Sequence, residues 1–399
     1  MLNRKIIGIA LLLLFLSDSF SIRGYDADLY RNMARLFLCV FAMYTLIRRS
    51  ELKKFNIRLK WFVLGLIIIP FLGFIPAYIL HEQNIILSFI GASKNIGYVF
   101  FFYLLLIQIE EKKIVKTFCI LGFCWVFIEL IQQFTYPHYW FASRYETYEK
   151  SIEVRNGIYR YSVAGVEFGL ILLFYCFERF MLLRNIKYLV GIIAGLVGVY
   201  LTTTRQVIAM SIICLFVGMF LMKKIKFWSF VFFCAVSLIV YMNVDTLFGE
   251  FIKMTEDVDE DYIRFHAYRF YGITYNDGDS LAFLLGNGSP YPPSSFYKEI
   301  SKYEEVFGLF IADIGIVGMY SQYGIIYVMM ILWFFVYVFK HRKYLDLYLQ
   351  LYVLFMAGTS IMLHHFAYKI PIVVTGAFIL YLIEQNIAKN KRLLRGIKK

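Results

Sequence analysis

The feature that most constrains this chain is the recurrence of long apolar runs from one end to the other. Each run has about 17 to 25 residues, and a helix of that length crosses roughly 30 Å of hydrocarbon. Hydrophobic residues make up 60% of the chain, and its mean hydropathy is +0.64. Backbone groups in hydrocarbon must bond within a helix or a closed barrel, and these runs lack the alternation of barrel strands. The sequence therefore predicts an all-α integral membrane protein.

The net charge of +13 would suit a nucleic-acid binder if the basic residues formed one surface. They lie between the apolar runs instead, which is the positive-inside pattern of cytoplasmic loops. The clusters of lysine and arginine occur at residues 4–5, 48–60, 112–116, 184–187, 223–226, 340–343 and 389–399. The charge therefore indicates membrane topology, with both termini in the cytoplasm, and predicts no nucleic-acid partner.

The basic clusters also fix how often the chain crosses the membrane, because two cytoplasmic clusters must be joined by an even number of spans. The 35 residues between Lys187 and Lys223 contain one charge, Arg205. As a helix they would reach about 53 Å, enough for two spans, so we expect a turn near Thr202–Arg205. The same reasoning predicts about twelve spans. They are expected near 6–22, 33–47, 61–80, 85–107, 114–134, 161–182, 187–204, 206–222, 227–247, 321–339, 345–363 and 370–385.

One connecting segment is much longer than the others. Residues 248–320 should form a large extracytoplasmic loop between the ninth and tenth spans, and acidic residues outnumber basic ones there. We expect residues 1–399 to form a single polytopic membrane domain, with the first run retained as a span because it lacks a small-residue cleavage site. No cytoplasmic segment is long enough for a nucleotide-binding domain, and no phosphate-binding glycine loop occurs.

Four arginines run against the positive-inside bias, because they fall in segments expected outside the membrane. Arg205 follows Thr202–Thr204 at a span junction, Arg160 directly precedes a span, and Arg264 and Arg269 lie in the large loop. The planar guanidinium fork matches phosphate oxygens, so all four are candidate diphosphate contacts. The alternative is an arginine that snorkels at a hairpin tip, and, for the loop pair, a solvated charged face.

Three further residues are candidate proton acceptors or catalytic groups. His266 would share a helical face with Arg269, Asp313 lies in an apolar stretch, and His365 belongs to a short turn between the last two spans. A carboxylate near the membrane is a functional candidate, although it can instead cap a helix or pair with an arginine. A histidine pair at the interface is often only solvated.

Three short segments resemble the bacterial O-antigen polymerase and O-antigen ligase superfamily. Tyr200-Leu-Thr-Thr-Thr-Arg-Gln-Val-Ile-Ala209 resembles its Thr/Ser-Arg segment at a span junction. Leu285-Gly-Asn-Gly-Ser289 resembles its Gly-x-Gly turn late in the large loop. Asp313-Ile-Gly-Ile-Val-Gly318 with Gln322-Tyr-Gly324 resembles the glycine-rich segment that opens the next span. The resemblance covers roughly residues 150 to 330, and the order of the segments and the expected topology support it.

The resemblance implies an inverting, metal-independent glycosyltransferase of the GT-C-like membrane class, without a cofactor, in the bacterial cytoplasmic membrane. Its substrate would be an undecaprenyl-diphosphate-linked oligosaccharide, polymerised into O-antigen, capsule or exopolysaccharide on the outer face of that membrane. Membrane lipid and a chain-length regulator protein are the further partners it implies. With no nucleotide-sugar domain inside, a lipid diphosphate would supply the energy, and fixed arginines would stabilise its departure.

Two alternatives stay open. The ligase branch typically carries a His-Asn pair where this chain has Ile311-Ala312-Asp313, a departure that favours a polymerase. A transporter or flippase of lipid-linked oligosaccharide would also need membrane arginines, but internal symmetry and short external loops are typical of such proteins.

Overall fold

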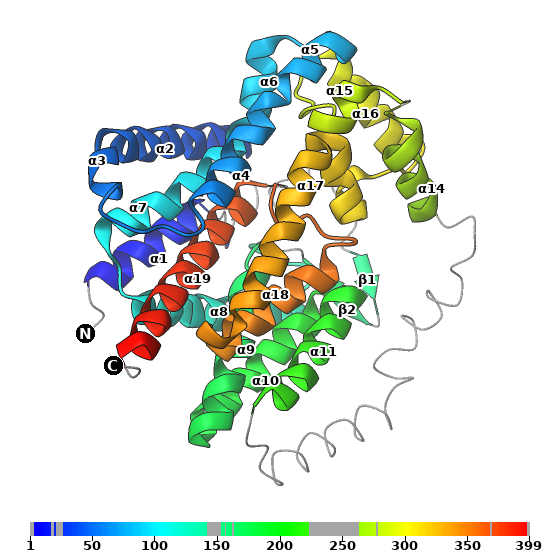
Figure 1. Cartoon of the computed structure of the whole chain (residues 1–399). Helices are drawn as coiled ribbons and strands as arrows, with labels where there is room; N and C mark the ends of the chain where they lie inside the picture. The colour runs from blue at the N-terminus through cyan, green and yellow to red at the C-terminus, as the bar shows by residue number, and fades with distance from the viewer. Residues whose placement is uncertain are drawn as a thin grey trace. The chain divides into compact units, whose positions relative to one another are not determined.

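The computed structural model describes residues 4–16, 20, 27–141, 153–155, 157–161, 163–222, 263–276, 278–367 and 369–396 (Figure 1). Helices form almost all of the regular structure in these ranges, and the two strands among them pair in one hairpin. The chain divides into two compact units, each built from segments that are distant in sequence. The all-α prediction is therefore confirmed for the described part of the chain, whereas a single membrane domain over 1–399 stays a prediction.

Unit 1 takes its described residues from 1–27, 112–259 and 346–355. It contains α1 (Arg4–Leu16), α8 (Glu111–Thr135, from its second residue), β1 (Glu153–Arg155), β2 (Ile158–Arg160), α9 (Val166–Leu183), α10 (Ile186–Leu201), α11 (Arg205–Leu221) and the first part of α18 (Leu347–Thr359). The strands are antiparallel, with Val154 opposite Tyr159.

Glycines let the helices of unit 1 approach a single tryptophan. Trp125 of α8 is buried, and a Cβ added at Gly165, Gly169 or Gly198 would collide with its indole ring. Small residues at helix contacts allow close backbone approach, which replaces the hydrophobic effect as the source of cohesion in lipid. The indole Nε1 also donates to the carbonyl of Val163 at 3.1 Å, so Trp125 joins α8 to the chain just before α9.

Unit 2 takes its described residues from 28–111, 260–345 and 356–399. It contains α2 (Ala27–Ile47), α3 (Arg49–Leu52), α4 (Lys60–Leu72), α5 (Phe74–His81), α6 (Ile85–Ala92), a 3₁₀ helix (Ser93–Tyr98), α7 (Val99–Ile107), α14 (Ile263–Arg269), a π-helical turn (Phe270–Thr274), α15 (Ser280–Leu285), α16 (Ser295–Glu305), a 3₁₀ turn (Ile311–Ile314), α17 (Gly315–His341), a 3₁₀ turn (Arg342–Tyr344), the end of α18 and α19 (Ile370–Gly396).

Polar contacts join the basic termini of α4, α17 and α19 on one side of unit 2. The carboxylate of Glu384 in α19 accepts hydrogen bonds from the backbone amides of Arg58 and Leu59, and it pairs with the Arg58 guanidinium at 3.1 Å. Asn390 donates to the carbonyl of Tyr344 at 2.8 Å. The start of α4 and the ends of α17 and α19 therefore lie together, as the positive-inside pattern requires, although the cytoplasmic location of this end stays a prediction.

The predicted large loop folds as a helical layer with its own core in unit 2. Buried apolar residues from five elements form that core: Ala77 of α5, Ala267 of α14, Tyr271 of the π-helical turn, Phe296 and Ile300 of α16, and Ile311 and Ile314 of the 3₁₀ turn. Residues 248–262, at the start of the predicted loop, lie outside the described ranges. The helical layer covers α5 and the start of α17, so it lies at the opposite end of these helices from the basic clusters.

Five helical segments of the described chain are long and apolar enough to cross a membrane: Lys60–His81, Ile85–Ile107, Glu111–Thr135, Ile311–Tyr344 and Ile370–Lys391. Each overlaps one predicted span. Shorter apolar helices at Asn32–Ile47, Ile186–Leu201, Arg205–Leu221 and Leu347–Thr359 overlap four more. α1 and α9 are helical where spans were predicted at 6–22 and 161–182, and the span predicted at 227–247 lies outside the described residues. The total of about twelve spans therefore stays a prediction.

The helix α17 is broken at Gly324, which has φ 74° and ψ 178°. In a continuous helix the carbonyls of Ser321 and Gln322 would accept from residues 325 and 326. Here they accept from the backbone amides of Asn287 and Gly288, at 2.8 and 2.9 Å. Non-helical backbone at membrane depth is tolerated only where protein or water satisfies it, and this pairing supplies the protein partner.

Candidate functional site

Arg205 is the first residue of α11 in unit 1, directly after the turn that the sequence predicted. The turn is closed by its own threonines: the Thr202 hydroxyl donates to Val199 at 2.7 Å, and the Thr204 hydroxyl donates to the carbonyl of Thr202 at 3.1 Å. Thr203 is fully buried in a left-handed conformation, with φ 50°. These contacts hold the turn in shape and leave the Arg205 side chain half-buried at the end of the helix pair.

Arg160 is the last residue of strand β2. The hairpin that β2 forms with β1 was not predicted from the sequence. Two glutamines at the end of α8 hold the segments next to the helix. Gln133 brackets Tyr159, accepting from its amide at 2.9 Å and donating to its carbonyl at 2.8 Å, while Gln132 does the same for Phe141. Arg160 is therefore fixed at the level of the α8 terminus, in the same unit as Arg205.

Arg264 and Asp313 come together in unit 2, at an N–O distance of 3.8 Å. Their side chains are 34% and 52% exposed, so the pair lies at the surface. An exposed pair contributes only about 0–1 kcal/mol, so an anionic ligand could displace the carboxylate at little cost. Asp313 thus has the arginine partner that the sequence analysis gave as its alternative role.

His266 and Arg269 lie on the exposed side of α14, whereas Ala267 on the opposite side packs into the apolar core. The helical spacing predicted for the pair is confirmed, because α14 spans both residues. Both residues therefore lie on the surface of unit 2.

His365 and its neighbour His364 occupy the turn between α18 and α19. His364 bonds to the carbonyl of Ile311 at 2.9 Å, and His365 bonds to the hydroxyl of Thr359 at 2.6 Å. Burial lowers the pKa of His364 to about 4, and Lys94 acts in the same direction. Burial and His364 lower the pKa of His365 to about 3, which makes it a weak proton acceptor at neutral pH. The catalytic role predicted for His365 stays a prediction.

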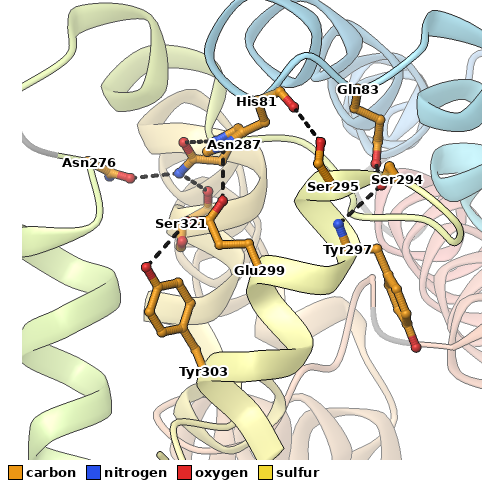
Figure 2. A network of polar contacts seen from close by, with 10 residues as sticks. All are labelled: His81, Gln83, Asn276, Asn287, Ser294, Ser295, Tyr297, Glu299, Tyr303 and Ser321. Atoms are coloured by element: carbon orange, nitrogen blue, oxygen red, sulfur yellow. Dashed lines mark hydrogen bonds and ion pairs between the residues drawn. The ribbon is translucent and has the colours of Figure 1, made fainter. Parts of the chain in front are cut away.

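A network of polar side chains that the sequence analysis missed lies where α5, α16 and the break in α17 meet. Figure 2 shows this network, which we call the His81–Asn287 network. Its members are His81, Gln83, Asn276, Asn287, Ser294, Ser295, Tyr297, Glu299, Tyr303 and Ser321. At its centre Asn287 bonds to His81 Nε2 at 3.0 Å, to Asn276 at 2.8 Å and to the Ser321 carbonyl at 3.0 Å.

Gln83 anchors one side of the network. Its amide oxygen accepts from the Tyr291 backbone amide at 3.0 Å and from the Ser294 hydroxyl at 2.8 Å, and its amide nitrogen donates to Ser289. Ser294 in turn caps α16 by accepting from the amide of Tyr297 at 3.1 Å. The start of α16 is therefore fixed to the end of α5. These contacts also position Glu299, which lies about one helical turn beyond the cap.

Aromatic rings pack against the network. The His81 ring is stacked on Phe296, with centroids 4.1 Å apart, and lies parallel to Tyr275 at 5.8 Å. The Tyr303 hydroxyl donates to Glu299 at 3.3 Å. Amide, carboxylate and imidazole groups beside aromatic faces are suited to a ligand with many hydroxyls, since polar groups fix its orientation and apolar walls cover its C–H faces.

The sequence did contain a signal for this network. His81 and Gln83 stand at the end of an apolar run, and Asn287 is the central residue of the Gly-Asn-Gly segment. What the sequence could not indicate is that these residues meet, because 206 residues separate His81 from Asn287.

No family model matches the chain, and no curated protein matches it either. Within the part of the chain that the structure describes, no group of three or more His, Cys, Asp or Glu side chains could hold a metal ion.

Proposed function

We propose that this chain is a membrane glycosyltransferase that polymerises oligosaccharide repeats linked to a lipid diphosphate. The observation that carries the proposal is the pairing of two segments of the O-antigen polymerase resemblance. The amides of Asn287 and Gly288 bond to the carbonyls of Ser321 and Gln322 at the break before Gly324. The pairing supports a common role for these segments, and it lies within the His81–Asn287 network.

The chemistry of the network supports a saccharide as substrate. Neutral amides and hydroxyls can each donate and accept, as sugar hydroxyls do, and Glu299 adds a carboxylate that is 42% exposed. The network lies at the end of unit 2 away from the basic clusters, where an extracytoplasmic substrate would arrive if the predicted topology holds.

Arginines near this end would bind the diphosphate. Arg264 is partly exposed and its pair with Asp313 is weak, so a diphosphate with two charged groups could replace the carboxylate. Arg269 lies on the same helix, α14. In the proposed reaction these cations stabilise the negative charge that develops as the lipid diphosphate leaves. Arg160 and Arg205 of unit 1 keep their predicted role as diphosphate contacts.

The predicted setting of the enzyme follows from this proposal. The helices of membrane-spanning length support a multi-pass membrane protein. A bacterial cytoplasmic membrane, termini on its inner face, and a chain-length regulator as partner are further parts of the proposal.

The test is a deletion of the gene in the parent cell, complemented by the wild-type protein, with the surface polysaccharide and the lipid-linked intermediates resolved by size. A polymerase predicts that long chains collapse to single repeats on the acceptor lipid. Long chains that accumulate on the lipid diphosphate would indicate a ligase. Single lipid-linked repeats that never reach the outer face would indicate a flippase, and an unchanged profile would refute all three.

A further inference from the structure

The hydrogen bonds of Asn287 fix which nitrogen of His81 carries a proton. The Ser321 carbonyl can only accept, so the Asn287 atom that contacts it at 3.0 Å must be the amide nitrogen. The Asn287 oxygen therefore faces His81 Nε2, at 3.0 Å, and must accept from an N–H there. In a neutral imidazole the other nitrogen, Nδ1, is then the unprotonated, basic one.

This basic nitrogen faces a carboxylate. His81 Nδ1 lies 3.9 Å from Glu299 Oε2, and the other carboxylate oxygen, Oε1, accepts from the Tyr303 hydroxyl at 3.3 Å. The gap is too long for a direct hydrogen bond. An oxygen about 2.8 Å from Nδ1 can also lie about 2.8 Å from Oε2, so a ligand hydroxyl at that point would donate its one proton to Nδ1 with the carboxylate beside it.

Two neighbouring polar atoms also lack a partner in the described chain. Asn276 must turn its oxygen toward Asn287, and its amide nitrogen is buried without a hydrogen bond to any described residue. The hydroxyl of Tyr275, whose ring lies parallel to that of His81, is also buried without a hydrogen bond to any described residue. Because a buried donor without a partner is energetically unfavourable, both atoms favour a ligand with further hydroxyls.

The geometry points to an acceptor site: His81 binds a hydroxyl of the acceptor saccharide and takes its proton, while Glu299 holds the imidazolium that forms. The hydroxyl oxygen bonds to the anomeric carbon of the lipid-linked donor, and the bond from that carbon to the diphosphate oxygen breaks. Its electron pair leaves with the lipid diphosphate, and the hydroxyl proton moves to His81 Nδ1. Transfer is complete without any further reactant.

This inference rests on the proposed function and names the general base within it. It differs from the earlier candidates, because Asp313 has an arginine partner and His365 bonds to Thr359. His81 combines a defined basic nitrogen with a carboxylate placed to stabilise its charged form.

The test uses the purified full-length protein in lipid nanodiscs with the undecaprenyl-diphosphate-linked repeat of the parent cell. His81→Gln keeps an N–H donor for Asn287 but removes the basic nitrogen. It should lower the elongation rate by about 100-fold or more, the usual contribution of a general base, while the affinity for the lipid-linked repeat stays within about threefold. Glu299→Gln should give an intermediate rate, and His138→Gln, an exposed histidine of unit 1, should match the wild type.

An H81Q protein that elongates at the wild-type rate would overturn the inference and leave the proposed function intact. Thermal unfolding checks that each variant is folded. If H81Q does not fold, the variant of the half-buried Glu299, Glu299→Gln, decides: a wild-type rate refutes the site, and a lowered rate with unchanged substrate affinity supports it. A wild-type protein that elongates no repeat would refute the proposed function, and this inference with it.

Discussion

Asn287 contacts the carbonyl oxygen of Ser321 twice, with its backbone amide at 2.8 Å and its side-chain amide at 3.0 Å. The double contact fills the place of a hydrogen bond that α17 loses at its break, and it orients the Asn287 side chain toward His81. The same residue thus satisfies the broken backbone of α17 and holds its side-chain oxygen against His81.

Asn287→Asp should destabilise the protein by about 1–3 kcal/mol, because a carboxylate cannot donate to Ser321 or Asn276 and would face their oxygens. Thermal unfolding in detergent measures the change. Asn84→Asp is the matched control: Asn84 caps α6 by accepting from Ile86, which Asp does equally well. Equal melting temperatures for both variants would contradict the Asn287 geometry.

Gly324→Ala and Gly286→Ala should each lower stability by about 1–3 kcal/mol. A Cβ at Gly324 would collide with the backbone of Leu284, and one at Gly286 with the backbone of Gln322. Gly278→Ala separates collision from backbone strain, because Gly278 has a similar φ of 72° but nothing within 4 Å of an added Cβ. If all three variants melt alike, the close crossing of the two segments is refuted.

His364 should make the protein sensitive to acid. Its pKa is about 4 in the folded protein and about 6.5 when unfolded, so below pH 6.5 the unfolded chain binds more protons. Stability is therefore lost as pH falls from 6.5 toward 4, by about 3 kcal/mol from this residue. His364→Gln keeps a donor for Ile311 and cannot titrate, so melting temperature should fall less steeply with acid in this variant. Parallel curves for both proteins would exclude the effect.

Arg205→Ala should shorten the surface polysaccharide toward single repeats, because a diphosphate contact at the end of α11 would be lost. Size-resolved polysaccharide from the complemented deletion strain measures this, after the variant is shown to reach the membrane. Lys187→Ala, at an exposed position near the other end of α10, is the control. Chains of normal length in the Arg205 variant would remove it from the site.

Asp313→Asn distinguishes an arginine partner from a catalytic base. If Asp313 only pairs with Arg264, the variant should elongate within about threefold of the wild type, since an exposed pair contributes little. Arg264→Ala should instead raise the KM for the lipid-linked repeat about tenfold or more, the value of one charge-assisted contact. A loss of turnover in Asp313→Asn with unchanged KM would return Asp313 to the catalytic role.

The sequence by itself determined the helices and several of their ends. Apolar runs partition into lipid locally, so the five segments of spanning length, and the turn before Arg205, follow from hydropathy and charge alone. The hairpin at β1 and β2 was missed although Asn156-Gly157 is a strong hairpin signal. Hydropathy is insensitive to so short an element between spans.

The candidate site was decided only by the tertiary structure. His81 and Asn287 stand 206 residues apart, and a polar residue at a helix end is ordinary until its partner is known. The break at Gly324 exposes the carbonyls of Ser321 and Gln322, and packing of α15 against α17 brings Asn287 to them. Local residue preferences define elements, whereas hydrogen-bond partners between distant segments depend on the packing that brings those segments together.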